Sequence, residues 1–108
     1  MELEFYWDGA GDPRARCKGK QGETLAGFLE GDLQGSARQA RAILRAIDRI
    51  EAGKLDDWET TGNSYTLTLS AKGASLLNEN EEDAVPVELP LSQLKDAVAG
   101  WTAFVDEG

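Results

Sequence analysis

The side chains of this chain that could do chemistry are carboxylates, gathered in two short acidic clusters. Their members are Asp56, Asp57, Glu59, Glu79, Glu81, Glu82 and Asp83. Such groups can bind calcium or act as the acid–base pair of a glycosidase. An EF-hand loop needs a central Gly and a terminal Glu over about 12 residues, and segment 78–83 has neither in place. Both clusters also fall in predicted turns or loops rather than across a cleft.

No other side chain supplies a reactive centre. The chain has no His, which removes the usual proton shuttle and a leading zinc ligand. Cys17 stands alone between Arg16 and Lys18, with no base and no second thiol, so we expect a small packed residue. No glycine-rich phosphate loop follows a predicted strand. We therefore expect no active site, no metal and no cofactor, and a protein that is not an enzyme.

The charge balance indicates what the protein binds. It has 20 Asp and Glu against 11 Lys and Arg, a net charge of -9. This excess favours rapid capture of a basic partner and argues against direct nucleic-acid binding, which needs clustered cations. We expect no membrane association, since no apolar run approaches ~20 residues and the N-terminus lacks a basic signal-peptide start. A single Cys fits the reducing cytoplasm.

A β-hairpin is predicted over residues 2–20. Residues 2–8 alternate, with Leu3, Phe5 and Trp7 on one face, and basic residues follow at every second position from Arg14 to Lys20. In an antiparallel hairpin the numbers of two facing residues add up to a constant. If this sum is even, the face that carries Glu2, Glu4 and Asp8 lies opposite the basic residues, whereas an odd sum leaves like charges adjacent. The predicted register has a sum of 22 and pairs Asp8 with Arg14, Tyr6 with Arg16, and Glu4 with Lys18.

A helix is predicted over residues 36–52, with Ser36 as its N-cap and Gly53 as its stop. Segment 23–35 precedes it and predicts only a short, imperfect helical turn, because it holds three glycines. The helix face opposite its apolar stripe carries four arginines, namely Arg38, Arg41, Arg45 and Arg49. This row is either a solvated face of the helix or a surface that binds a carboxylate-rich or phosphate-bearing partner.

The second half predicts a β-meander over residues 55–90 and a C-terminal helix over 92–106, capped by Ser92. Gly62-Asn63 is typical of a type II′ hairpin loop, which makes paired residues sum to 125. Pro86 and Pro90 mark the last strand as an edge. The predicted fold is a single α+β domain over residues 1–108, with an antiparallel sheet of five or six strands and two main helices on one face.

Several segments together resemble a bacterial family. They are LEFY at residues 3–6, the helix opening at Ser36, WETTGNSYTL at residues 58–67, and Trp101 with Phe104. The chain resembles the YacL-like family, some members of which are immunity proteins of contact-dependent growth inhibition systems. The resemblance implies an α+β fold and, for immunity members, a cytoplasmic protein that neutralises a cognate toxin domain, often a nuclease. No binding residue carries over from it.

Charge and resemblance together predict an immunity protein that binds a basic toxin C-terminal domain stoichiometrically. The two acidic clusters are the candidate contacts, which the meander would bring to neighbouring edges of the sheet. The competing interpretation is that both are solubilising loops. A housekeeping interaction or regulatory module resembling the non-immunity relatives is the alternative function.

Overall fold

The computed structural model describes residues 3–107 and contains three helices, a single π-helical turn (η1) and six strands. In chain order they are β1 (Glu4–Trp7), β2 (Pro13–Arg16), α1 (Gly19–Phe28), η1 (Leu29–Leu33), α2 (Ala37–Glu51), β3 (Asp57–Thr61), β4 (Tyr65–Ser70), β5 (Gly73–Asn78), β6 (Val87–Leu89) and α3 (Leu91–Glu107). The predicted α+β class and strand total are confirmed, but the prediction of a single sheet is wrong. The strands divide into a two-stranded sheet, β1-β2, and a four-stranded sheet, β3-β4-β5-β6, both antiparallel.

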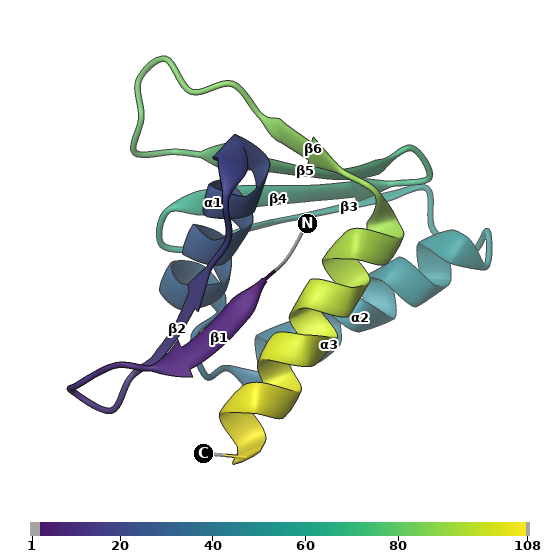
Figure 1. Ribbon diagram of the computed structural model, residues 1–108. Helices are drawn as coiled ribbons and strands as arrows, with labels where there is room; N and C mark the ends of the chain where they lie inside the picture. Colours follow the sequence, from purple (N-terminus) through teal and green to yellow (C-terminus); the bar gives the residue numbers. More distant parts are fainter. Residues whose placement is uncertain (1–2, 108) are drawn as a thin grey trace.

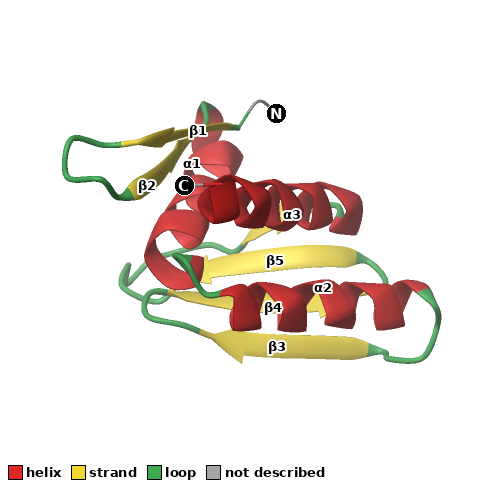
Figure 2. Cartoon of the chain, turned by 90° about the horizontal axis from the view of Figure 1, so that it is seen from below, coloured by secondary structure: helices red, strands yellow, loops and turns green. Residues whose placement is uncertain are grey.

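The four-stranded sheet and the helices form two layers. The helices lie on one face of this sheet, and the other face is left open (Figure 1). Figure 2, seen from the helical side, shows α2 and α3 side by side, running along the direction of the strands that they cover. Alternate residues of the strands point into the core, where they meet the apolar stripes of the helices. The fully buried large residues include Leu67, Leu69, Leu76, Ile43, Ile47, Leu94, Val98 and Trp101.

The two long helices begin and end largely as predicted. The Ser36 hydroxyl accepts a hydrogen bond from the backbone N–H of Gln39 at 3.2 Å, which confirms the N-cap of α2. Gly53 follows the helix with a φ of 73°, a left-handed conformation that glycine adopts without strain. Helix α3 starts one residue early, at Leu91. The Pro90 carbonyl accepts from Gln93 and Leu94, so the prediction that Ser92 caps this helix is wrong.

Helix α1 and the π-helical turn η1 replace the imperfect turn predicted for segment 23–35. Glycine weakens a helix, but two glycines of α1 let this helix approach other elements closely. A Cβ at Gly27 would lie 2.5 Å from the Tyr65 hydroxyl, and one at Gly22 would overlap the Cys17 side chain. The prediction of a hairpin to residue 20 is also wrong, because β2 ends at Arg16 and Lys18 precedes the first turn of α1.

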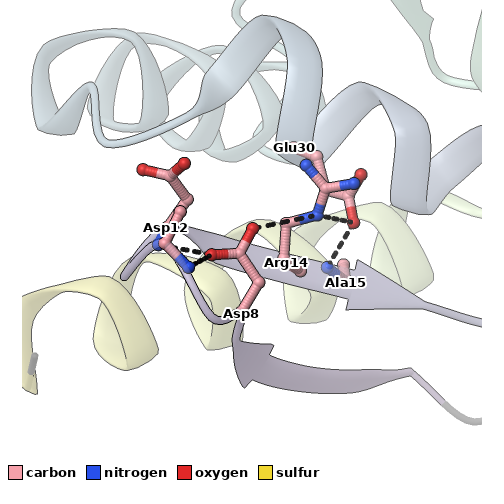
Figure 3. Close-up of polar contacts among 6 residues, drawn as sticks. Asp8, Asp12, Arg14, Ala15 and Glu30 are labelled. Atoms are coloured by element: carbon pink, nitrogen blue, oxygen red, sulfur yellow. Dashed lines mark hydrogen bonds and ion pairs between the residues drawn. The ribbon is translucent and has the colours of Figure 1, made fainter.

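The β1-β2 hairpin has the predicted even sum, but the sum is 20 rather than 22. Glu4 pairs with Arg16 and Tyr6 with Arg14. The turn fixes this register, because the Asp8 carboxylate accepts from the backbone N–H groups of Ala10 and Asp12, both at 2.9 Å (Figure 3). The predicted register of Asp8, Tyr6 and Lys18 is therefore wrong, although the Arg14 guanidinium still lies 3.9 Å from the Asp8 carboxylate and Glu4 still faces a basic residue.

Polar contacts from η1 and aromatic contacts from α3 hold the hairpin in place. Glu30 on η1 accepts from the backbone N–H of Ala15 at 2.7 Å and lies 3.6 Å from the Arg14 guanidinium (Figure 3). On the other side, the Trp7 and Phe104 rings stack with centroids 5.1 Å apart. The hairpin thus bridges η1 and α3.

The β3-β4 hairpin has a residue sum of 127, not 125. Trp58 pairs with Leu69 and Thr60 with Leu67, so each predicted partner is displaced by two residues and the apolar face is kept. Gly62 does not have the positive φ that a type II′ loop needs at its first central position, so that prediction is wrong. The buried carboxylate of Asp32, on η1, instead accepts from the backbone N–H groups of Ser64 at 2.9 Å and Tyr65 at 2.8 Å. A contact from a distant element therefore sets the turn.

Candidate functional site

The open face of the four-stranded sheet carries hydroxyl and carboxylate side chains. Because side chains alternate along a strand, the residues between the buried ones on β4 point to solvent. They are Thr66, Thr68 and Ser70, which all lie on this open face. Strand β3 pairs Asp57 with Ser70 and Glu59 with Thr68, so both acids lie on the same face. Both are exposed.

A chain of side-chain hydrogen bonds crosses this face from β3 to the loop after β5. The Thr61 and Thr66 hydroxyls lie 3.0 Å apart, and the Thr66 hydroxyl donates to the Glu79 carboxylate at 2.6 Å. The backbone N–H of Glu79 also donates to the Ser64 carbonyl at 2.7 Å. Glu79 is therefore held against the open face. We call Asp57, Glu59 and Glu79 the acidic face.

The other four candidate acids lie elsewhere. Asp56 precedes β3, and Glu82 and Asp83 lie in the exposed loop 79–86. Glu81 belongs to the opposite side of the loop, where it lines a groove with residues of α1. The expectation that the two clusters occupy neighbouring edges is wrong. Asp57 lies at the end of the sheet where the β4-β5 turn is, and loop 79–86 lies at the other end. Four residues of strand separate the two ends, which is about 13 Å along the strand direction.

The candidate acids are not neutralised by the protein's own bases. Five pairs of basic and acidic atoms within 4.0 Å occur among residues 3–107, and none includes any of the seven acids. Glu88, on β6, faces the same side as Ser75 and adds a further exposed carboxylate. Sequence reasoning missed it, although the alternation Val87-Glu88-Leu89 in a predicted edge strand could have revealed it.

A shallow depression hollows this face near the β4-β5 turn. It is lined by Thr68, Ser70, Ser75 and Glu88, with Lys72 at the turn. The arrangement offers hydroxyl donors and acceptors beside carboxylate acceptors, which suits hydrogen bonding and ion pairing with a cationic surface. Within residues 3–107 no set of three or more His, Cys, Asp or Glu residues is placed to hold a metal ion.

The arginine row forms a second charged surface. Arg38, Arg41, Arg45 and Arg49 are all exposed on α2. Across the described part of the chain, none of the ion pairs involves them. The acids of the same helix, Asp48 and Glu51, instead pair with Lys95 on α3 at 3.2 and 3.4 Å. The arginine row thus gives α2 one basic face, whereas the open face of the sheet is acidic.

No helix within residues 3–107 is both long enough and apolar enough to cross a bilayer.

Comparison with known proteins places the chain in a family. Its residues 1–104 match the model of the uncharacterised protein family UPF0231. A protein of Shewanella amazonensis, named "UPF0231 protein", is 28% identical over 123 residues, covering 99% of this chain and 98% of that protein. No solved structure matches the chain. The resemblance noted in the sequence is thus confirmed at the level of the family, and the chain belongs to the UPF0231 family.

Proposed function

We propose that this protein acts by binding a basic protein partner stoichiometrically on the acidic face, without turnover. The observation that carries the proposal is the shared placement of Asp57, Glu59 and Glu79 on an open sheet face with no paired base among the described residues. Unpaired carboxylates attract a cationic surface over a distance of about 10 Å at moderate salt. They also discriminate against acidic competitors.

The partner that fits this surface best is the toxin domain of a contact-dependent growth inhibition system, and the protein is then its immunity protein in the cytoplasm. Nucleases carry basic surfaces where they hold nucleic acid, so an acidic inhibitor both finds and covers such a surface. The open face of four strands provides a platform for an interface of about 1,600 Å² in total. The inhibitor needs no cofactor, metal or active site for this task.

Rescue of growth tests the proposal. The toxin domain encoded beside the gene is expressed with either the wild-type protein or the triple variant Asp57→Asn, Glu59→Gln and Glu79→Gln. We expect wild-type protein to rescue growth and the triple variant to lose most of the rescue, because three charges leave the acidic face. Each replacement keeps the shape of its side chain, and Gln at position 79 can still accept from Thr66.

A matched control separates the acidic face from net charge. The variant Asp12→Asn, Asp106→Asn and Glu107→Gln removes three exposed acids far from this face, and we expect it to rescue as the wild type does. Equal rescue by the two triple variants contradicts a role for the acidic face. Absence of rescue by the wild-type protein contradicts the immunity function for that toxin.

A housekeeping interaction or regulatory module is the second candidate function. The arginine row on α2 favours it, because a molecule with one acidic and one basic face can hold two partners of opposite charge. Isolation of the protein with two such partners, neither of them a toxin, favours this candidate over the first.

A further inference from the structure

A groove of about 430 Å³ lies beside the acidic face, on the helical side of loop 79–86. Helix α1 supplies one wall, the loop supplies the other, and the ends of β4, β5 and β6 form the floor. Its size falls within the range of sites that enclose small ligands, which leaves ample room for one long side chain. It opens to solvent at the end of the sheet where Glu79 is anchored.

The walls of this groove combine apolar surface with carboxylates. Val85 is 68% exposed, the largest exposed fraction among the exposed large hydrophobic residues. With Val87 and the ring of Tyr65 it offers an aliphatic and aromatic lining. Glu23 projects from α1 and Glu81 from the loop, so the two walls each bring a negative charge. An apolar lining with acids on both sides matches a long alkyl chain that ends in a cation.

Tyr65, on the floor of the groove, lies near several carboxylates. Burial raises the pKa of its phenol above the ordinary value of 10.0, and the charges of Asp32, Glu81 and Glu30 raise the pKa further. Of these three acids only Glu81 lines the groove, so it is the one whose charge can act on an occupant there. The groove's own cation, Lys20, lies on α1 and forms no ion pair among the described residues.

We infer that the groove receives one long basic side chain of the partner, with its methylenes on Val85, Val87 and Tyr65 and its cation between Glu23 and Glu81. The inference rests on the proposed function for the identity of the partner, and it assigns Glu81 a place apart from the acidic face. It also gives a role to the exposed Val85 in a loop that carries four acids. A buried hydrophobic stem with a paired charge is typical of interface hot spots.

A peptide experiment tests the groove without the partner. The probe is Ac-Gly-Lys-Gly-NH2, and its comparison is the same peptide with norleucine, which keeps the stem and lacks the charge. Amide chemical shifts of the full chain are followed by NMR during each titration. We expect the lysine peptide to perturb residues of α1 and loop 79–86, and the norleucine peptide to bind about fivefold more weakly.

Two variants of opposite sign sharpen the test. Glu81→Gln removes an attractive charge and is expected to weaken lysine-peptide binding about threefold, whereas Lys20→Gln removes a repulsive charge and is expected to strengthen it about twofold. A change of general stability would not reverse sign in this way. Val85→Ser is expected to weaken both peptides alike, and Glu107→Gln, at the end of α3, is the control with no effect.

The outcomes separate this inference from the proposed function. Shifts confined to the open sheet face, equal binding of the two peptides, or the same sign for Glu81→Gln and Lys20→Gln each overturn the groove as a basic side-chain site. Binding of a toxin that depends on Asp57, Glu59 and Glu79 but not on Glu81 leaves the proposed function standing while the groove inference falls. If the lysine peptide binds in the groove but the protein does not rescue growth, the groove inference stands while the proposed function falls.

Discussion

The backbone N–H of Tyr65 donates to the buried carboxylate of Asp32 at 2.8 Å, across 33 positions of sequence. The same carboxylate accepts from Ser64 at 2.9 Å. Since Ser64 in turn accepts from the N–H of Glu79, the turn that Asp32 holds also anchors the acidic loop. The π-helical turn η1 thus supports the candidate binding surface from behind.

Replacing Asp32 tests this support. Asp32→Ala leaves two backbone N–H groups without their charged acceptor in a poorly solvated place, so we expect a loss of about 3 kcal/mol in the free energy of unfolding. Urea denaturation of the variant and the wild type measures it. Asp83→Ala, in the exposed loop, is the matched control and is expected to change stability by less than about 0.5 kcal/mol. A comparable loss in the two variants would contradict the account.

Gly62 packs directly against the Asp32 carboxylate and offers a second test of its role. A Cβ at Gly62 would lie 2.5 Å from Asp32 Oδ2 and 2.8 Å from its carboxyl carbon. Gly62→Ala is therefore expected to destabilise the wild-type protein by about 2 kcal/mol, and by much less once Asp32 is already Ala. A double-mutant cycle from urea denaturation measures this coupling. Additive losses would show that the overlap with Asp32 is not the cause.

Gln34 holds a strained backbone conformation between η1 and α2. Its φ of 48° and ψ of -130° lie where only glycine is comfortable. Gln34→Gly is expected to raise the free energy of unfolding by about 1 kcal/mol, even though a side-chain hydrogen bond to Gly31 is lost. The Trp101 indole still donates to the carbonyl of residue 34.

The control for this prediction is a glutamine in ordinary helical conformation. Gln39→Gly, inside α2, is expected to lower stability by about 1 kcal/mol, since glycine weakens a helix. Thermal unfolding of both variants decides the matter. Destabilisation by both would mean that the conformation of Gln34 carries no strain that glycine relieves.

The Asp8 carboxyl in the β1-β2 turn should make the stability of the fold depend on pH. A hydrogen bond from the backbone N–H of Asp12 lowers the pKa of Asp8 below its ordinary value of 3.8, with further lowering by Ala10 and Arg14. A carboxyl group with a lowered pKa stabilises the fold above its ordinary pKa, and this stabilisation is lost as the pH falls through the folded-state pKa.

The expected outcome is a pH-dependent difference between wild type and Asp8→Asn. The wild type should have the higher melting temperature at pH 6, and the difference should shrink as the pH falls below about 4. Asp12→Asn changes a neighbouring carboxyl whose oxygens accept no side-chain hydrogen bond among the described residues, and it is the control. A difference that persists unchanged at pH 2.5 would show that the Asp8 charge does not act in this way.

Local signals in the sequence predict the parts of the fold that depend on neighbouring residues. Ser36 and Gly53 bound α2 because a cap and a left-handed stop are decided within one helical turn. The face of each strand was also predictable, since alternation fixes which side chains are buried. The hydroxyl row of β4 and the positions of Asp57 and Glu59 on the open face follow from it.

Contacts between distant elements explain the rest. Glycines 22 and 27 read as helix breakers, yet they are the places where α1 meets Cys17 and Tyr65. The β3-β4 register depends on a carboxylate of η1, which no local pattern reveals. For the same reason the two acidic clusters could be found but not placed, because their separation follows from the register and from the Thr66–Glu79 hydrogen bond.

The central claim is that the acidic face binds a basic protein, and its most direct test is the salt dependence of affinity for the polypeptide that co-purifies with the chain from its host. Binding is measured by calorimetry over about a tenfold range of salt, from roughly 50 to roughly 500 mM. The account predicts a basic partner, an affinity that falls steeply with salt, and a shallower slope for the Asp57, Glu59 and Glu79 triple variant. An acidic partner, or an affinity that neither salt nor the triple variant changes, would contradict it.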